Sequence, residues 1–188
     1  MAIIDDILKF NSKFVEDKKY VPYISEKFPK KKLAILACMD TRLIELLPAA
    51  LDIKNGEAKI IKNAGALISH PFGSVMRSLL VAIYGLGVRD IMIIGHTDCG
   101  MERLDLQELV KKMEQRGVFP NATGMTCECG TDLHKWLYGF DSTDESIKAG
   151  VNMVKNHQLI PKDVTVRGFV MDINTGKLRE ITGQGFFS

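Results

Sequence analysis

Residues Leu33–Cys38 read Leu-Ala-Ile-Leu-Ala-Cys, a continuous apolar run that predicts a strand buried on both faces of a sheet. Two more runs, Ala58–Ile61 and Ile91–Ile94, predict further strands, and Gly95 closes the second of these. Amphipathic stretches separate the runs, and their apolar spacing is typical of helices. Strands that alternate with helices indicate a mostly parallel sheet with helices on both faces.

The helices are predicted from apolar spacing and from end signals such as Pro at the start and Gly at the end. They cover Ile4–Lys19, Pro71–Leu86, Glu102–Arg116, Asp132–Tyr138 and Ser142–His157. The alternating run Val164–Val170, a turn at Asn174–Gly176 and the short run Leu178–Ile181 predict a C-terminal strand hairpin. We therefore expect one α/β domain over residues 1–188, in which residues 1–30 form an N-terminal helical arm.

Composition is that of an ordinary globular protein, with 188 residues, 46% hydrophobic residues, 26% charged residues and a net charge of +2. The densest basic run, Lys30–Lys32, precedes a strand and reads as a solvated start of that strand, so we expect no nucleic-acid partner. No apolar segment approaches the ~20 residues of a membrane span, and no signal core is present. These features predict a cytoplasmic protein without membrane association. Four cysteines then favour metal binding or catalysis over disulfides.

Two short motifs follow predicted strands, Cys38–Arg42 after the first strand and Gly95–Gly100 after the third. In an open parallel sheet, ligands gather at the carboxyl ends of strands where the winding direction reverses. If these strands are neighbours there, Cys38, His96 and Cys99 can meet at one metal ion. Two thiolates and one imidazole suit zinc, and three protein ligands leave the fourth position for water. That arrangement is typical of a catalytic site rather than a structural one.

A carboxylate and an arginine follow the first cysteine ligand. Because two thiolates neutralise Zn²⁺, the metal acidifies water less than one held by three imidazoles, and a neighbouring group must position the water's proton. Asp40 is placed for that role, and Arg42 can hold its carboxylate in a forked pair. Without Arg42, Asp40 could itself occupy the fourth position and exclude water.

Together the two motifs, Cys-x-Asp-x-Arg and His-x-x-Cys-Gly, resemble the signature of the β-class carbonic anhydrases. Lys62–Gly65 is similar to the Arg-Asn-Ala-Gly segment of that family. Gly168–Asp172 and Thr175–Leu178 resemble the ending of its shorter prokaryotic members. The similarity covers most of the chain, from about Leu33 onward. It departs from the family pattern at Lys62, where Arg is usual, and at Ala66, where Asn is frequent.

This resemblance implies a reversible hydration of carbon dioxide to bicarbonate and a proton, by an enzyme that carries Zn²⁺. It implies zinc on Cys38, His96 and Cys99, a catalytic pair of Asp40 and Arg42, and Gly65 in the segment that lines the substrate pocket. It further implies a homodimer or a dimer of dimers, in which the N-terminal helix reaches over the partner subunit.

Two alternative functions use the same residues. Relatives in the family hydrolyse carbon disulfide, and no motif separates the two substrates because a linear apolar molecule makes few directed contacts. A non-catalytic zinc protein is the other alternative, with Asp40 as the fourth ligand. Cys127 and Cys129 lie near His134, but their spacing differs from that of common zinc sites. Inert loop cysteines, a redox pair and a second metal site all fit them.

Overall fold

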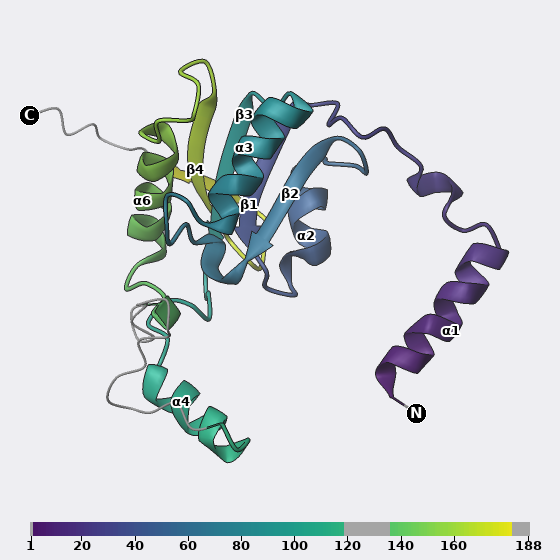
Figure 1. Cartoon of the computed structure of the whole chain (residues 1–188), viewed down its shortest axis with the longest axis horizontal. Helices are drawn as coiled ribbons and strands as arrows, with labels where there is room; N and C mark the ends of the chain where they lie inside the picture. The colour runs from purple at the N-terminus through teal and green to yellow at the C-terminus, as the bar shows by residue number, and fades with distance from the viewer. Residues whose placement is uncertain (1, 119–135, 182–188) are drawn as a thin grey trace, which may run out of the picture.

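Five strands form one sheet at the centre of the computed structural model, which describes residues 2–118 and 136–181 (Figure 1). Their order across the sheet is β2-β1-β3-β4-β5. The strands are β1 (Leu33–Cys38), β2 (Ala58–Asn63), β3 (Asp90–His96), β4 (Thr165–Met171) and β5 (Leu178–Ile181). All neighbours pair in parallel except β4 and β5, which are antiparallel. The mostly parallel sheet and the C-terminal hairpin predicted from the sequence are therefore confirmed.

The winding direction of the sheet reverses between β1 and β3. From β1 the chain moves outward to β2 at one edge, then crosses back over β1 to β3 and continues toward β4 on the other side. The two strands pair directly, with Leu36 opposite Ile93 and Ala37 opposite Ile94. Their carboxyl ends therefore flank the crevice in which open parallel sheets bind ligands.

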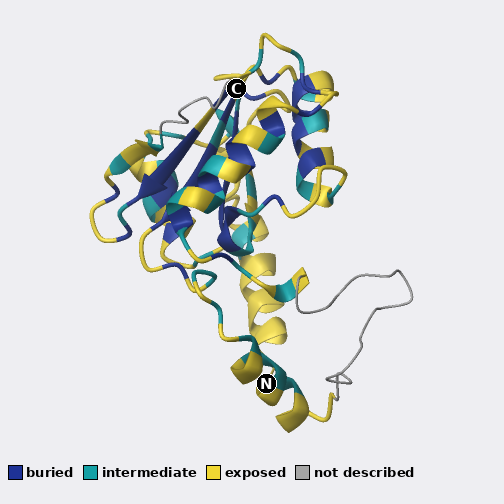
Figure 2. Ribbon diagram, turned by 90° about the vertical axis from the view of Figure 1, so that its left-hand side faces the viewer, coloured by how far each residue is buried: buried dark blue, intermediate teal, exposed yellow. Residues whose placement is uncertain are grey.

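Helices cover both faces of the sheet. The helices α3 (Ser74–Leu86) and α6 (Thr143–Lys155) pack on one face, and α2 (Leu43–Ala50) packs on the other. Alternate strand side chains enter the two layers, with Ala34 and Leu36 in the first and Ile35 and Ala37 in the second. Figure 2 shows the buried strands between partly exposed helices. The apolar run that predicted β1 is thus explained by burial on both sides.

Two helices begin later than the sequence predicts. The helix α4 (Leu106–Gln115) begins four residues after the predicted Glu102, because the Asp105 carboxylate accepts hydrogen bonds from the backbone N–H groups of Gln107 and Glu108 at 2.9 and 3.0 Å. Glu102 instead forms an isolated bridge with Phe140. The helix α3 begins at Ser74 rather than Pro71, because a turn precedes it in which the Gly73 N–H donates to the His70 carbonyl at 3.0 Å.

The sequence patterns do not predict α2. The helix has only eight residues and contains Pro48. Because proline lacks the N–H donor that a helix interior needs, its presence argues against a helix when only the sequence is read. Leu43 and Leu47, four positions apart, are fully buried on its inner side and fix it against the sheet.

The helix α1 (Ile3–Glu16) lies away from the sheet and buries none of its residues (Figure 1). A short 3-10 helix, η1 (Val21–Tyr23), lies between α1 and the sheet, and a second, η2 (Ala64–Ala66), follows β2. The predicted helix Ile4–Lys19 is confirmed, although it ends at Glu16. Within the described ranges, no helix has the length and apolarity that a bilayer crossing requires. Cys127 and Cys129, and most of the predicted helix Asp132–Tyr138, lie outside the described residues.

Candidate metal centre

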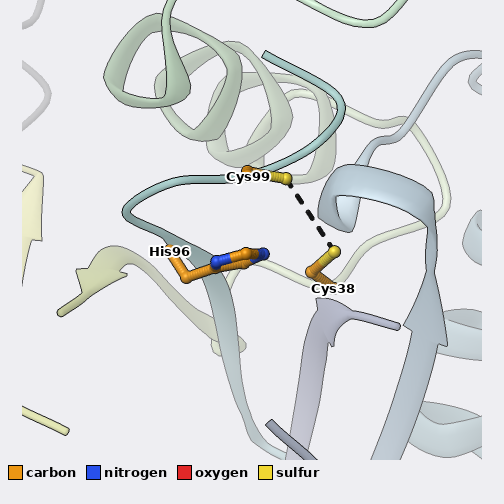
Figure 3. A group of neighbouring side chains, drawn as sticks. All are labelled: Cys38, His96 and Cys99. Atoms are coloured by element: carbon orange, nitrogen blue, oxygen red, sulfur yellow. Dashed lines mark hydrogen bonds between the residues drawn. The ribbon is translucent and has the colours of Figure 1, made fainter. Parts of the chain in front are cut away.

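Cys38, His96 and Cys99 lie together at the carboxyl ends of β1 and β3 (Figure 3). Cys38 ends β1 and His96 ends β3, while Cys99 lies in the loop that follows β3. Each offers one ligand atom, and these three atoms all lie within 4.8 Å of one another. All three side chains are buried. The reversal of winding between β1 and β3 thus joins residues that are 61 positions apart.

The spacing of the ligand atoms fits a tetrahedral metal ion. Two sulfurs bound at ~2.3 Å to such an ion lie about 3.8 Å apart, and the Sγ atoms of Cys38 and Cys99 are separated by 3.9 Å. The Nδ1 atom of His96 lies 2.8 Å from the carbonyl oxygen of Thr97, which as an acceptor requires the proton on Nδ1. This tautomer leaves a lone pair on Nε2, which is buried and has no hydrogen-bond partner among the described residues. A metal ion would satisfy this unpaired nitrogen.

Backbone N–H groups and the neighbouring thiol stabilise the thiolate form of Cys38. Its pKa is lowered chiefly by the hydrogen bond from Cys99, with further contributions from His96 and from the N–H groups of Asp40 and Gly65. The Gly65 nitrogen lies 3.3 Å from Sγ. The pKa of Cys99 is raised, because the Cys38 thiolate and burial both oppose a second negative charge. The two thiols therefore do not readily ionise together without metal, and a cation that favours both thiolates would release thiol protons on binding.

Burial lowers the pKa of His96, but the adjacent Cys38 thiolate and the hydrogen bond to the Thr97 carbonyl outweigh it and raise the pKa. A bound cation opposes protonation of a ligand, so metal binding would reverse this balance.

Asp40 lies beside the three ligands but is held by Arg42. The guanidinium donates from Nε to Oδ1 at 3.0 Å and from Nη2 to Oδ2 at 2.8 Å, and the Arg42 backbone N–H donates to Oδ1 at 2.9 Å. These hydrogen bonds lower the pKa of Asp40 to about 2, although partial burial opposes this. Oδ2 is also 3.9 Å from Nε2 of His96. The carboxylate is therefore ionised at neutral pH and lies at the edge of the ligand group without belonging to it.

One residue of this site is absent from the sequence prediction. Asp98 accepts hydrogen bonds from Arg42 on both its carboxylate, at 2.8 Å from Nη1, and its backbone carbonyl, at 3.0 Å from Nη2. It lies within the Gly95–Gly100 motif, but its pairing with Arg42 spans 56 positions. The only sequence signal for it is an acidic side chain placed between two ligands.

The family model for carbonic anhydrase matches residues 33–178 of this chain. A crystal structure of β-carbonic anhydrase isoform I from Trichomonas vaginalis matches the fold with a TM-score of 0.85 and 34% sequence identity, covering 98% of this chain and all of that one. The chain belongs to the β-carbonic anhydrase family. The resemblance in the two motifs is thereby confirmed.

Two curated relatives of this β-carbonic anhydrase family member show the range of functions among similar chains. The Bacillus subtilis protein YvdA, a candidate carbonic anhydrase, is 53% identical over 178 residues, which is 95% of this chain and 90% of the relative. A carbon disulfide hydrolase from Acidithiobacillus thiooxidans is 33% identical over 158 residues, which is 79% of this chain and 76% of the relative.

Gly65 and Lys62 are the remaining residues that the family resemblance singles out. Gly65 has φ 75°, and a Cβ atom there would lie 2.8 Å from Cε1 of Phe140 and 3.0 Å from Cβ of Met101. A side chain at position 65 would therefore be strained by the left-handed backbone and crowded by Phe140 and Met101. Lys62 donates from Nζ to the Leu43 carbonyl at 3.2 Å. Burial lowers its pKa although the negative charges of Cys38 and Asp40 act to raise it. Its ammonium group thereby links β2 to the start of α2.

Proposed function

We propose that this β-carbonic anhydrase family member catalyses the reversible hydration of carbon dioxide, with zinc held by Cys38, His96 and Cys99. The observation that carries the proposal is the position of Asp40. Its carboxylate is bound to Arg42 and stays outside a three-ligand group, which leaves one tetrahedral position for water. A non-catalytic zinc protein would instead use Asp40 to complete the metal shell. Zinc bound there would supply the Lewis acidity that makes water nucleophilic at neutral pH.

The side chains around the ligands have distinct tasks in this mechanism. Asp40 accepts a hydrogen bond from the attacking water and orients it, since Oδ2 lies near the ligand atom of His96. Because the pKa of Asp40 is about 2, its carboxylate orients a proton but does not retain it, so the proton passes on to solvent or buffer. Arg42 keeps Asp40 aimed, and the Thr97 carbonyl fixes the tautomer of His96.

Asp40→Asn tests this assignment. The amide keeps the size of the side chain but cannot accept two hydrogen bonds from Arg42 as a carboxylate does. We expect the variant to keep one equivalent of zinc and to lose about 100-fold or more of its turnover, the loss typical of removing a positioned proton-handling group. Zinc content and stopped-flow hydration of carbon dioxide are measured on the same preparation.

Asp144→Asn is the matched control, because Asp144 forms a similar two-point pair with Arg179 at 2.8 and 2.9 Å, away from the ligands. It should hydrate carbon dioxide like the wild type. Wild-type turnover in Asp40→Asn would reject the role of Asp40, and wild-type protein without stoichiometric metal would reject the zinc site.

Hydrolysis of carbon disulfide is a second candidate function, favoured by the 33% identity to the hydrolase of Acidithiobacillus thiooxidans. Carbon dioxide is preferred because the 53% identity to YvdA is much higher and extends over more of the chain. Both substrates are assayed with purified protein. Release of hydrogen sulfide from carbon disulfide without hydration of carbon dioxide would replace the first proposal by the second.

We also propose that residues 1–188 form one domain whose first 30 residues act as an arm in a homodimer or a dimer of dimers. The arm exposes an apolar face of α1 that has no contact with the sheet, including Ile4, Ile7 and Leu8. Such a face is typical of a subunit interface. Sedimentation equilibrium should show a dimer or tetramer, and deletion of residues 1–16 should weaken it. A monomeric full-length chain would contradict this proposal.

A cytoplasmic location is proposed because the site requires reduced cysteines. Fractionation of cells that express the chain tests it, and recovery outside the cytoplasmic fraction would contradict it.

A further inference from the structure

Asp98 is an exposed residue that is nevertheless hydrogen-bonded to Arg42 at two of its atoms. Its side chain is 81% exposed, yet its carboxylate and its backbone carbonyl both accept hydrogen bonds from Arg42. Its φ of 55° places it in the left-handed region, which aspartate and asparagine tolerate better than most residues. The left-handed backbone explains why a short polar residue is found at this position, but asparagine would serve equally well. The negative charge is explained by the ion pair with Arg42.

The guanidinium of Arg42 is held from two loops at once. Nε and one hydrogen of Nη2 face Asp40, whereas Nη1 and the other side of Nη2 face Asp98. A planar guanidinium with donors fixed on two sides cannot rotate without breaking both sets of bonds. The Arg42 side chain is 44% exposed, so without Asp98 only the hydrogen bonds to Asp40 hold its guanidinium, and the two side chains can then move together.

We propose that Asp98 is a positioning residue that holds Arg42 in the orientation that keeps Asp40 outside the metal shell. The inference rests on the proposed function, and it adds a third member to the Asp40–Arg42 pair. The strand β3 and the loop after it thereby do more than supply His96 and Cys99, because Asp98 in that loop also holds the arginine that follows β1. Asp98 acts only through Arg42 and does not touch the reacting atoms.

The test compares Asp98→Asn in the wild-type background and in an Arg42→Ala background. Asparagine suits the left-handed backbone and keeps an accepting oxygen, so it removes the charge and little else. Because an exposed ion pair contributes little, we expect a loss of about two- to fivefold in kcat/KM, with zinc content unchanged. In the Arg42→Ala background the same substitution should cause no further loss. Equal losses in both backgrounds, or no loss in either, would overturn the proposal. Asp144→Asn serves again as the control for removing an exposed aspartate.

A spectroscopic measurement separates this proposal from the proposed function. In the cobalt-loaded protein, visible absorption responds to replacement of water by a carboxylate in the metal shell. We expect Asp98→Asn to change that spectrum at neutral pH, and the change to vanish when Asp40→Asn is also present. A spectrum unaffected by Asp98→Asn, or a change that persists without the Asp40 carboxylate, contradicts the positioning role. The outcome does not depend on which substrate is turned over, so a chain that fails to hydrate carbon dioxide still gives a decision on Asp98.

Discussion

Gly65→Ala is expected to destabilise the fold and weaken the metal site together. Gly65 has φ 75°, and an alanine in the left-handed region costs roughly 1–2 kcal/mol. The added Cβ would also lie 2.8 Å from Phe140 and 3.0 Å from Met101, and such crowding in a packed region costs about 1–3 kcal/mol. The free energy of unfolding should therefore fall by about 3 kcal/mol, within a range of roughly 2–5 kcal/mol.

The same substitution should lower metal affinity, because the Gly65 N–H donates to Cys38 Sγ at 3.3 Å. Relief of the crowding displaces this donor, and weakening a hydrogen bond to a charged sulfur by about 1.4 kcal/mol corresponds to a tenfold loss of affinity. Gly87→Ala is the matched control. Gly87 has nearly the same φ, 72°, but in the described part of the chain no heavy atom outside its sequence neighbours lies within 4 Å of its added Cβ.

Urea unfolding at room temperature, with a reductant and a chelator present, measures the free energy of unfolding of the metal-free protein. Competition with a chromophoric chelator measures zinc affinity separately. Gly87→Ala should lose about 1–2 kcal/mol of unfolding free energy and bind zinc normally. Equal destabilisation by the two substitutions, with zinc affinity unchanged in both, would refute the assigned packing and the thiolate contact.

Three further outcomes are expected. Cys38→Ser should fold but retain little zinc, as measured by elemental analysis; stoichiometric zinc in this variant would remove Cys38 from the ligand set. Since the pKa of Asp40 is lowered from 3.8 to about 2, its pairing with Arg42 stabilises the fold above about pH 4, and this contribution is lost as pH falls toward 2. The difference in unfolding free energy between wild type and Asp40→Asn should therefore shrink over that interval, and a constant difference contradicts the pairing. Ser142→Ala should lower the free energy of unfolding in urea by about 0.5 kcal/mol, which is the lower end for loss of a helix cap. The expected loss is small because the Ser142 Oγ lies 3.5 Å from the Glu145 nitrogen. A loss above about 2 kcal/mol would show that Ser142 has another role.

The strands and the ligands could be predicted because each has a local signal. The run Leu33–Cys38 has no polar residue and indicates burial on both faces, and the motifs that follow β1 and β3 place their ligands at strand ends. The helix α2 lacks such a signal, since Pro48 interrupts a pattern of only eight residues. The pairing of Asp98 with Arg42 arises because two loops, far apart in the sequence, meet in space. The spacing of residues within either loop does not predict this contact.

The placement of Cys38 and His96 on neighbouring parallel strands ties the metal site to one long-range step of folding. Parallel pairing of β1 with β3 requires the whole crossover through β2 and α3 to be in place, and closure of such a long loop is slow. The three ligands can therefore hold one cation together only after these strands have paired, so metal binding adds its free energy to the native topology.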